Sequence, residues 1–176
     1  MPHYMVYHSC DISQQQYQAF ASALTKLHCD LFSAPSAFVN ITFLPSPSSS
    51  STSTSSPTVH TFVGAHSHPT NFIHAHLRPR GPSNAPKLHT LVTTTMALWS
   101  EHIGTDSGRL DDIKALHNVF IFEDLAAGAE QGFVVPRAGG EGEWARENMG
   151  EFERREREGD EGMGRLVGEL KAKMGE

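Results

Sequence analysis

The sequence predicts an α/β (α+β) fold built from two βαβ units in tandem. Strand-like and helix-like hydrophobic patterns alternate along the chain, and the order strand, helix, strand occurs twice. The length of 176 residues is also enough for one domain with a sizeable buried core. Each unit is expected to place its helix on one face of a shared sheet.

The first unit is expected to begin with a short apolar strand that starts near Pro2. Residues 11–32 then change to helical spacing, and Ser13 followed by Gln16 fits a capping box at the start of this helix. Residues 36–43 alternate apolar and polar side chains, which predicts a second strand. The apolar stripe expected along the helix consists of Phe20, Leu24, Leu27 and Leu31.

A Ser/Thr/Pro-rich tract separates the two units. It runs from Leu44 to Thr58 and has almost no apolar side chains after its first residue. Such a composition cannot bury enough surface to offset the entropy of ordering. We therefore expect a disordered surface insertion over residues 45–58, and a phosphorylated or recognised tract is the alternative.

The second unit repeats the pattern. Residues 60–66 and 71–78 are expected to form short strands, residues 81–104 a helix, and residues 119–122 a buried strand. A proline fits the first turn of this helix and a glycine fits its end. The residues that carry these signals are Pro86 and Gly104 at the two ends, with Leu88, Leu91, Val92, Thr95, Trp99 and His102 or Ile103 along the stripe.

The remaining segment has a different composition. Residues 1–144 are expected to form the main domain, and residues 145–176 a charged C-terminal helix or tail. A solvated or frayed helix is the simplest interpretation, and docking on a neighbouring subunit is the alternative. The apolar residues that could share one side of this helix are Met163, Val167, Leu170 and Met174.

Bulk properties exclude several classes of protein. The net charge of −6 is opposite to that of a nucleic-acid-binding protein. No apolar run reaches the roughly 20 residues of a membrane-spanning helix, and we expect no signal peptide. The two cysteines, Cys10 and Cys29, do not make a disulfide framework. We therefore expect a cytoplasmic protein.

The second residue offers unusual chemistry. If Met1 is removed, the nitrogen of Pro2 becomes a secondary amine. An α-amino group titrates near pH 8, and burial beside a cation lowers its pKa. Such an amine can take a proton from a substrate and return it at another atom. The alternative is a second-position proline with no functional role.

Four further side chains could complete a site around this amine. Arg78 and Arg80 lie where a strand passes into a loop, and guanidinium groups match a carboxylate in two-point geometry. His28 lies on the stripe of the first helix, where it could hold an anion or simply pack at the edge of the core. Glu130 lies in a loop, where it could orient water or remain solvated.

Five segments in this order resemble the tautomerase superfamily, and specifically its cis-3-chloroacrylic acid dehalogenase group. They are PHYMVY, ALTKLHCDL, FIHAHLR, EQGFVVP and GGEGEW, which together span residues 2–144. The resemblance implies a tautomerase-like fold and a homotrimer around a central barrel. It also implies an enzyme for a small carboxylate substrate that needs no cofactor or metal. The roles it implies are Pro2 as catalytic group, His28 in catalysis and substrate binding, Arg78 in substrate binding, and Glu130 as activator of water.

Two positions depart from the pattern of that group. The second family arginine falls on Gly81, so Arg80 is expected to replace it. The family tyrosine falls on Ile121, which has no hydroxyl to position a water. Keto-enol tautomerisation tolerates this loss better than hydration or hydrolytic dehalogenation of 3-haloacrylates. We therefore expect a tautomerase in which the latter activities are weak.

Two other functions remain open at this level. The segments HSH and HAH place His66, His68, His74 and His76 at alternate positions, so facing strands could form a metal site. Alternatively, the altered arginine and tyrosine positions are compatible with a catalytically inactive trimeric protein of the same fold.

Overall fold

The computed structural model describes residues 2–45 and 61–174, with the side chain of the last residue excluded. The expected insertion at 45–58 therefore lies almost wholly outside the described residues, and only Pro45 belongs to an element. Within the described part, no helix is both long and apolar enough to cross a membrane. The elements of the two units are β1 (His3–His8), α1 (Gln14–Phe32), β2 (Asn40–Pro45), β5 (Asn71–His76), α2 (Ala85–His102) and β6 (Leu116–Phe122), with short 3₁₀ turns η1 (Ser36–Phe38) and η2 (Pro82–Asn84).

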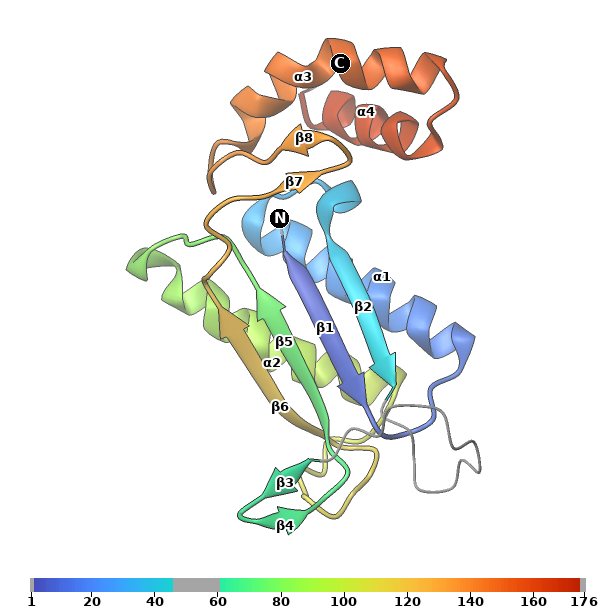
Figure 1. The fold of residues 1–176 in the computed structure, drawn as a ribbon, viewed down its shortest axis with the longest axis vertical. Coiled ribbons are helices and arrows are strands. Elements are labelled where there is room, and N and C mark those ends of the chain that lie inside the picture. The colour runs from blue at the N-terminus through green and yellow to red at the C-terminus, as the bar shows by residue number, and fades with distance from the viewer. Residues whose placement is uncertain (1, 46–60, 175–176) are drawn as a thin grey trace.

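These strands form one open sheet in the order β2-β1-β5-β6. Pairing is parallel within each unit, between β1 and β2 and between β5 and β6, and antiparallel where the units meet. Both helices lie on the same face of the sheet (Figure 1). The prediction of two tandem βαβ units in a mixed α/β fold is confirmed.

Local sequence signals account for the first helix. The Ser13 hydroxyl accepts a hydrogen bond from the Gln16 amide N–H, and the Gln16 side chain accepts one from the Ser13 N–H, which completes the predicted capping box. The helix ends at Ser33 in the left-handed conformation, with φ of 57°. The residues that α1 buries are Phe20, Leu24, His28 and Phe32.

The second helix also follows its sequence. Pro86 lies in the first turn of α2, where its missing N–H costs no hydrogen bond. After the helix, Gly104 passes so close to the neighbouring loop that a Cβ would lie 1.9 Å from the carbonyl oxygen of Lys114. The indole of Trp99 donates to that same oxygen at 2.9 Å, so a glycine is needed where the helix ends.

The main core lies between the sheet and the two helices. It joins Tyr4 and Val6 of β1 to Ile73 of β5 and to Trp99 of α2. The opposite face of the sheet has no helix over it in the described chain (Figure 1). This face carries a group of aromatic rings. The rings in mutual contact on that face are Tyr7, Phe72, His74, His76, Phe120 and Phe122.

Two short hairpins lie at opposite ends of the sheet. At one end β3 (Phe62–Val63) pairs with β4 (His66–Ser67), in place of the single strand predicted over residues 60–66. At the other end β7 (Ala129–Glu130) pairs with β8 (Phe133–Val134) close to the N-terminus (Figure 1).

The C-terminal segment forms two packed helices, α3 (Glu141–Arg157) and α4 (Glu161–Met174), which lie above β7 and β8 (Figure 1). The solvated or frayed helix that the composition favours is therefore not what the structure shows. The two helices pair with each other and with distant parts of the chain, so sparse apolar side chains are enough to bury a second core. Its members are Phe38, Phe133, Trp144, Ala145, Phe152, Met163, Leu166, Val167 and Leu170.

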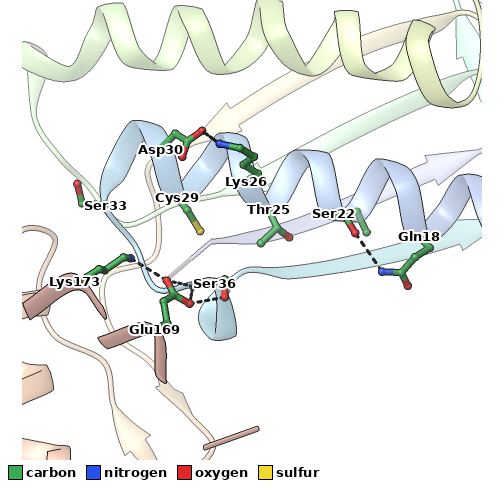
Figure 2. Close-up of a pocket in the computed structure, with 11 residues that line it drawn as sticks. Gln18, Ser22, Thr25, Lys26, Cys29, Asp30, Ser33, Ser36, Glu169 and Lys173 are labelled. Carbon is green, nitrogen blue, oxygen red and sulfur yellow. Dashed lines mark hydrogen bonds and ion pairs between the residues drawn. The ribbon is translucent and has the colours of Figure 1, made fainter. Parts of the chain in front are cut away.

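Polar contacts tie this helical pair to the first unit. The carboxylate of Glu169 in α4 accepts hydrogen bonds from the backbone N–H and the hydroxyl of Ser36, at 2.9 and 2.5 Å (Figure 2). Lys173 donates to that carboxylate at 2.9 Å and to the carbonyl oxygen of Ala34 at 3.2 Å. The open groove drawn in Figure 2 lies beside these contacts, along the outer side of α1.

Candidate active site

A cavity of about 320 Å³ opens at the N-terminal end of β1. It brings together Pro2, Arg78 and Glu130, which come from three distant parts of the sequence. The sheet explains the first two: β1 and β5 are antiparallel, and His3 pairs with His76, so the start of β1 lies beside the end of β5. Other residues that line the cavity are His3, Asn40, Thr42, Leu125, Ala127, Gly128, Ala129 and Val135.

Pro2 is buried and lies between two strands at this edge. Its carbonyl oxygen accepts a hydrogen bond from the backbone N–H of Asn40 at 3.2 Å. That bond continues the parallel ladder of β1 and β2, in which His3 pairs with Asn40. The position of Pro2 at the mouth of the sheet is therefore set by strand pairing.

Glu130 reaches the cavity from β7. The turn after it uses Gln131 and Gly132, both with positive φ (52° and 89°), as a two-residue hairpin loop requires. Burial raises the pKa of the Glu130 carboxyl, against the opposing effects of the Arg78 charge and a hydrogen bond from the Asn40 amide. A carboxyl group of this kind can exchange protons closer to neutral pH than a solvated one.

Asn40 is a cavity residue that the sequence reasoning did not single out. Its side-chain amide donates to a Glu130 carboxylate oxygen at 3.0 Å. The available signal was its place at the start of β2, because the first residues of two adjacent parallel strands lie at the same edge of a sheet.

Arg78 lies deep in the wall of the cavity, with a side chain that is 5% exposed. One terminal nitrogen donates to the carbonyl oxygen of Pro136, and the other donates to the carboxylate of Glu141. The third donor, Nε–H, is buried and has no acceptor among the residues that the structure describes. Within the described part of the chain, both terminal nitrogens of Arg78 are therefore hydrogen-bonded and Nε is not.

Arg80 is not among the described residues that line the cavity. Its guanidinium lies over the ring of Phe32, 4.5 Å from the centroid, and 3.6 Å from the same carboxylate oxygen of Glu141. Arg78 and Arg80 are thus joined through Glu141. Sequence reasoning missed Glu141 because it begins a helix that belongs to the second core.

His28 also lies behind the cavity wall rather than in it. Its Nδ1 is 2.8 Å from the hydroxyl of Tyr4, and the residue is only 2% exposed. Burial, together with the nearby charge of Arg80, lowers the pKa of His28 to about 3. A neutral imidazole at this place can fix the Tyr4 hydroxyl but carries no charge for an anion.

The comparison with known families draws on most of the chain. The family described as "Putative oxalocrotonate tautomerase enzyme" matches residues 1–149, from β1 through the first half of α3. The chain belongs to this tautomerase family. No curated protein matches the tautomerase chain in sequence.

Solved structures share the tautomerase fold at low sequence identity. N1, a member of the cis-3-chloroacrylic acid dehalogenase family, is 22% identical, with a TM-score of 0.58 over 81% of this chain and 90% of that chain. A protein from the thermophilic fungus Aspergillus fumigatus is 20% identical, with a TM-score of 0.56 over 84% and 94%. A fused 4-OT described as an asymmetric trimer is 16% identical, with a TM-score of 0.53 over 74% and 94%. The predicted membership of the tautomerase superfamily is confirmed.

The tautomerase sheet places Ile121 away from the cavity. Ile121 of β6 pairs with Ala75 of β5 and packs against the main core, on the side of the sheet that the helices cover. The hydroxyl of Tyr4, near the start of β1, is hydrogen-bonded to His28. Ile121 therefore does not supply a polar group to the site.

The histidine pairs lie on separate sheets. His66 belongs to the β3–β4 hairpin, whereas His74 and His76 lie on the aromatic face of β5. Among residues 2–45 and 61–174, no three or more His, Cys, Asp or Glu side chains are grouped so that they could hold a metal ion. The described arrangement gives no support to the metal-binding alternative.

Proposed function

We propose that this chain is a cytoplasmic tautomerase that uses the Pro2 nitrogen as general acid and base on a small enolic or unsaturated monocarboxylate. The observation that carries the proposal is the single cavity shared by Pro2, Arg78 and Glu130. The proposal requires that Met1 be removed, so that the Pro2 nitrogen is a secondary amine.

Burial and the nearby guanidinium are proposed to favour the neutral form of the Pro2 amine. Pro2 is buried, and the positive charge of Arg78 lines the same cavity. Both burial and a nearby cation disfavour the protonated amine and lower its pKa. In the proposed reaction the amine takes the proton from the enol hydroxyl, the carbonyl forms, and the same proton is delivered to the substrate carbon.

Arg78 and Glu130 are proposed to orient the substrate. The guanidinium of Arg78 would donate to one oxygen of the substrate carboxylate, and its positive charge would stabilise the negative charge that develops on the enolate. Glu130, whose pKa burial raises, could hold a proton opposite the substrate or position a water. Arg80 and His28 would act from behind the wall, Arg80 through Glu141 and His28 through Tyr4.

Ketonisation fits this site better than hydration or dehalogenation of 3-haloacrylates. Water activation needs a second polar group to hold the water beside Glu130, and Ile121 packs into the core instead. Proton transfer between oxygen and carbon needs only the amine and an anchored substrate. Weak hydration through Glu130 is a secondary expectation.

The proposal is tested with Pro2→Ala and with phenylenolpyruvate as substrate, followed by the change in ultraviolet absorbance on ketonisation. We expect kcat/KM to fall by about 10²-fold or more, the usual contribution of a general acid-base group. Pro86→Ala, at an exposed proline in the first turn of α2, is the matched control and should retain activity. Full activity in Pro2→Ala would refute the mechanism. Active protein whose intact mass still includes Met1 would refute it as well.

We also propose that the enzyme is a homotrimer in which the uncovered sheet faces meet as a central barrel. Phe120 is 50% exposed and Phe122 is 37% exposed in the single chain, and both belong to the aromatic cluster through contacts with His74. Exposed apolar patches of this kind mark association surfaces. The fused 4-OT of similar fold is itself described as a trimer.

A further inference from the structure

The carboxylate of Glu141 occupies the position between the two arginines. One of its oxygens contacts a terminal nitrogen of Arg78 and lies 3.6 Å from a terminal nitrogen of Arg80. All three side chains are largely buried, with 5, 11 and 15% of Arg78, Arg80 and Glu141 exposed. A buried carboxylate so close to two guanidiniums is their counter-ion.

The backbone holds Glu141 firmly at this place. It is the first residue of α3, where the helix N-terminus favours a negative charge. One turn later, Trp144 is buried in the second core and its indole donates to the carbonyl oxygen of Val134 at 2.9 Å. The contact between Glu169 and Ser36 anchors the other helix of the pair. The carboxylate can therefore leave the arginines only by rotation of its own side chain.

This arrangement changes what the cavity offers to an anion. Both terminal nitrogens of Arg78 already donate, to Pro136 and to Glu141, and the Nε–H that has no acceptor among the described residues is itself buried. Glu130 lines the same cavity and adds a further carboxyl. A ligand carboxylate placed at Arg78 meets terminal nitrogens that already donate to Pro136 and Glu141, together with the negative charge of Glu141, and like charges at short range oppose each other.

We propose that Glu141 sets the anion specificity of the cavity, as an internal carboxylate that competes with a ligand carboxylate for Arg78. In its presence the cavity binds a monocarboxylate weakly. When its charge is removed, the guanidinium of Arg78 is no longer neutralised by Glu141 and binds a ligand carboxylate more tightly. The inference rests on the proposed function to the extent that Arg78 is the anchor of the substrate.

The test compares the full-length protein with Glu141→Gln and with Glu143→Gln as matched control. Glu143 lies in the same first turn of α3, is exposed, and makes no ion pair within the described chain. Benzoate is the charged probe and benzamide is its neutral counterpart, and both affinities are measured by calorimetry. We expect Glu141→Gln to bind benzoate about tenfold more tightly, a change typical of a rearranged charge pair, with no change for benzamide. Glu143→Gln should match the wild type with both probes.

Three outcomes overturn the proposal. Benzoate affinity that is unchanged or weaker in Glu141→Gln means that Glu141 does not compete for Arg78 and instead holds it in place. An equal gain for benzamide means that the substitution made space rather than removed a charge. Failure of benzoate to bind either protein overturns it as well.

Loss of the counter-ion could destabilise Glu141→Gln, so Glu141→Asp provides a second variant. It keeps the charge but withdraws the carboxylate by one methylene, and we expect a smaller gain in benzoate affinity, about two- to threefold. If Glu141→Gln does not fold, unchanged or weaker benzoate binding by Glu141→Asp overturns the inference.

The two proposals fail in different ways. Full ketonisation activity in Pro2→Ala would remove the proposed function, while the benzoate comparison between wild type and Glu141→Gln would still stand. Conversely, if activity depends on Pro2 but Glu141→Gln binds benzoate with unchanged affinity, the proposed function stands and the proposed role of Glu141 is wrong.

Discussion

The hydroxyl of Tyr4 lies 2.8 Å from Nδ1 of His28, and both side chains are buried. The bond joins β1, two residues after Pro2, to the last third of α1. Burial lowers the pKa of His28 to about 3 and raises the pKa of Tyr4, so both groups stay neutral over the ordinary pH range. The pair therefore joins the start of β1 to α1 through two neutral groups.

The first prediction concerns acid stability. In the unfolded chain His28 takes up a proton near pH 6.5, whereas the folded protein resists protonation down to about pH 3. Between these values the unfolded state binds more protons, so the free energy of unfolding falls as the pH falls. We expect His28 to account for a loss of about 1–3 kcal/mol between pH 6.5 and pH 4.

Urea unfolding of the wild type and of His28→Gln at a series of pH values measures this effect. The slope of unfolding free energy against pH should be smaller in His28→Gln below pH 6.5. His89→Gln, at an exposed histidine of α2, should keep the wild-type slope. Parallel curves for wild type and His28→Gln would show that His28 protonates equally in both states.

The second prediction concerns the amide of Asn40. Its hydrogen bond stabilises the charged form of Glu130, so Asn40→Ala should raise the pKa of Glu130 further. The titration of the Glu130 side-chain carboxyl carbon, followed by NMR, reports the midpoint directly. Thr42→Ala changes another cavity residue, whose hydroxyl is 3.2 Å from His3 Nε2, and should leave the midpoint in place. A midpoint that moves down in Asn40→Ala would contradict the assigned role of the amide.

The elements that the sequence predicted depend on local interactions. The capping box of Ser13 and Gln16, the proline of α2 and the apolar stripe that includes Trp99 each belong to one helix, so their signals are complete in a short window. The meeting of Pro2, Arg78 and Glu130 followed instead from the resemblance of ordered motifs, because no local pattern joins residues so far apart.

The parts that the sequence did not predict depend on contacts between distant segments. The C-terminal helices are highly charged, and their few apolar residues become a core only against Phe38 and Phe133. The position of Glu141 beside the arginines was not predicted for the same reason, because it depends on the packing of α3, of which Glu141 is the first residue. Asn40 could have been found from the pairing of β1 with β2.

The third prediction tests this second core. Phe152 is fully buried, with its ring 4.8 Å from that of Phe133 and 5.4 Å from that of Trp144. Phe152→Ala should cost about 3–5 kcal/mol of stability, and the emission of Trp144 should shift to longer wavelength as the core admits water. Phe62→Ala, at a side chain that is 64% exposed, should change stability by about 0.5 kcal/mol or less. A Phe152→Ala protein as stable as the wild type would mean that the helical pair is not held by this core.

The fourth prediction tests the proposed trimer through the uncovered face of the sheet. Phe120 lies on that face in the edge strand β6, with its ring 5.9 Å from that of His74. In a trimer that buries this face, Phe120→Asp would place three charges in an apolar interior, and burial of an unpaired charge is strongly unfavourable. We expect the wild type to sediment with the mass of three chains, and Phe120→Asp to dissociate at concentrations at least about tenfold higher than the wild type. Val134→Asp, on β8 and 74% exposed, should remain trimeric. A wild type that sediments as one chain, or a Phe120→Asp protein that stays trimeric, would show that the aromatic face is not the interface.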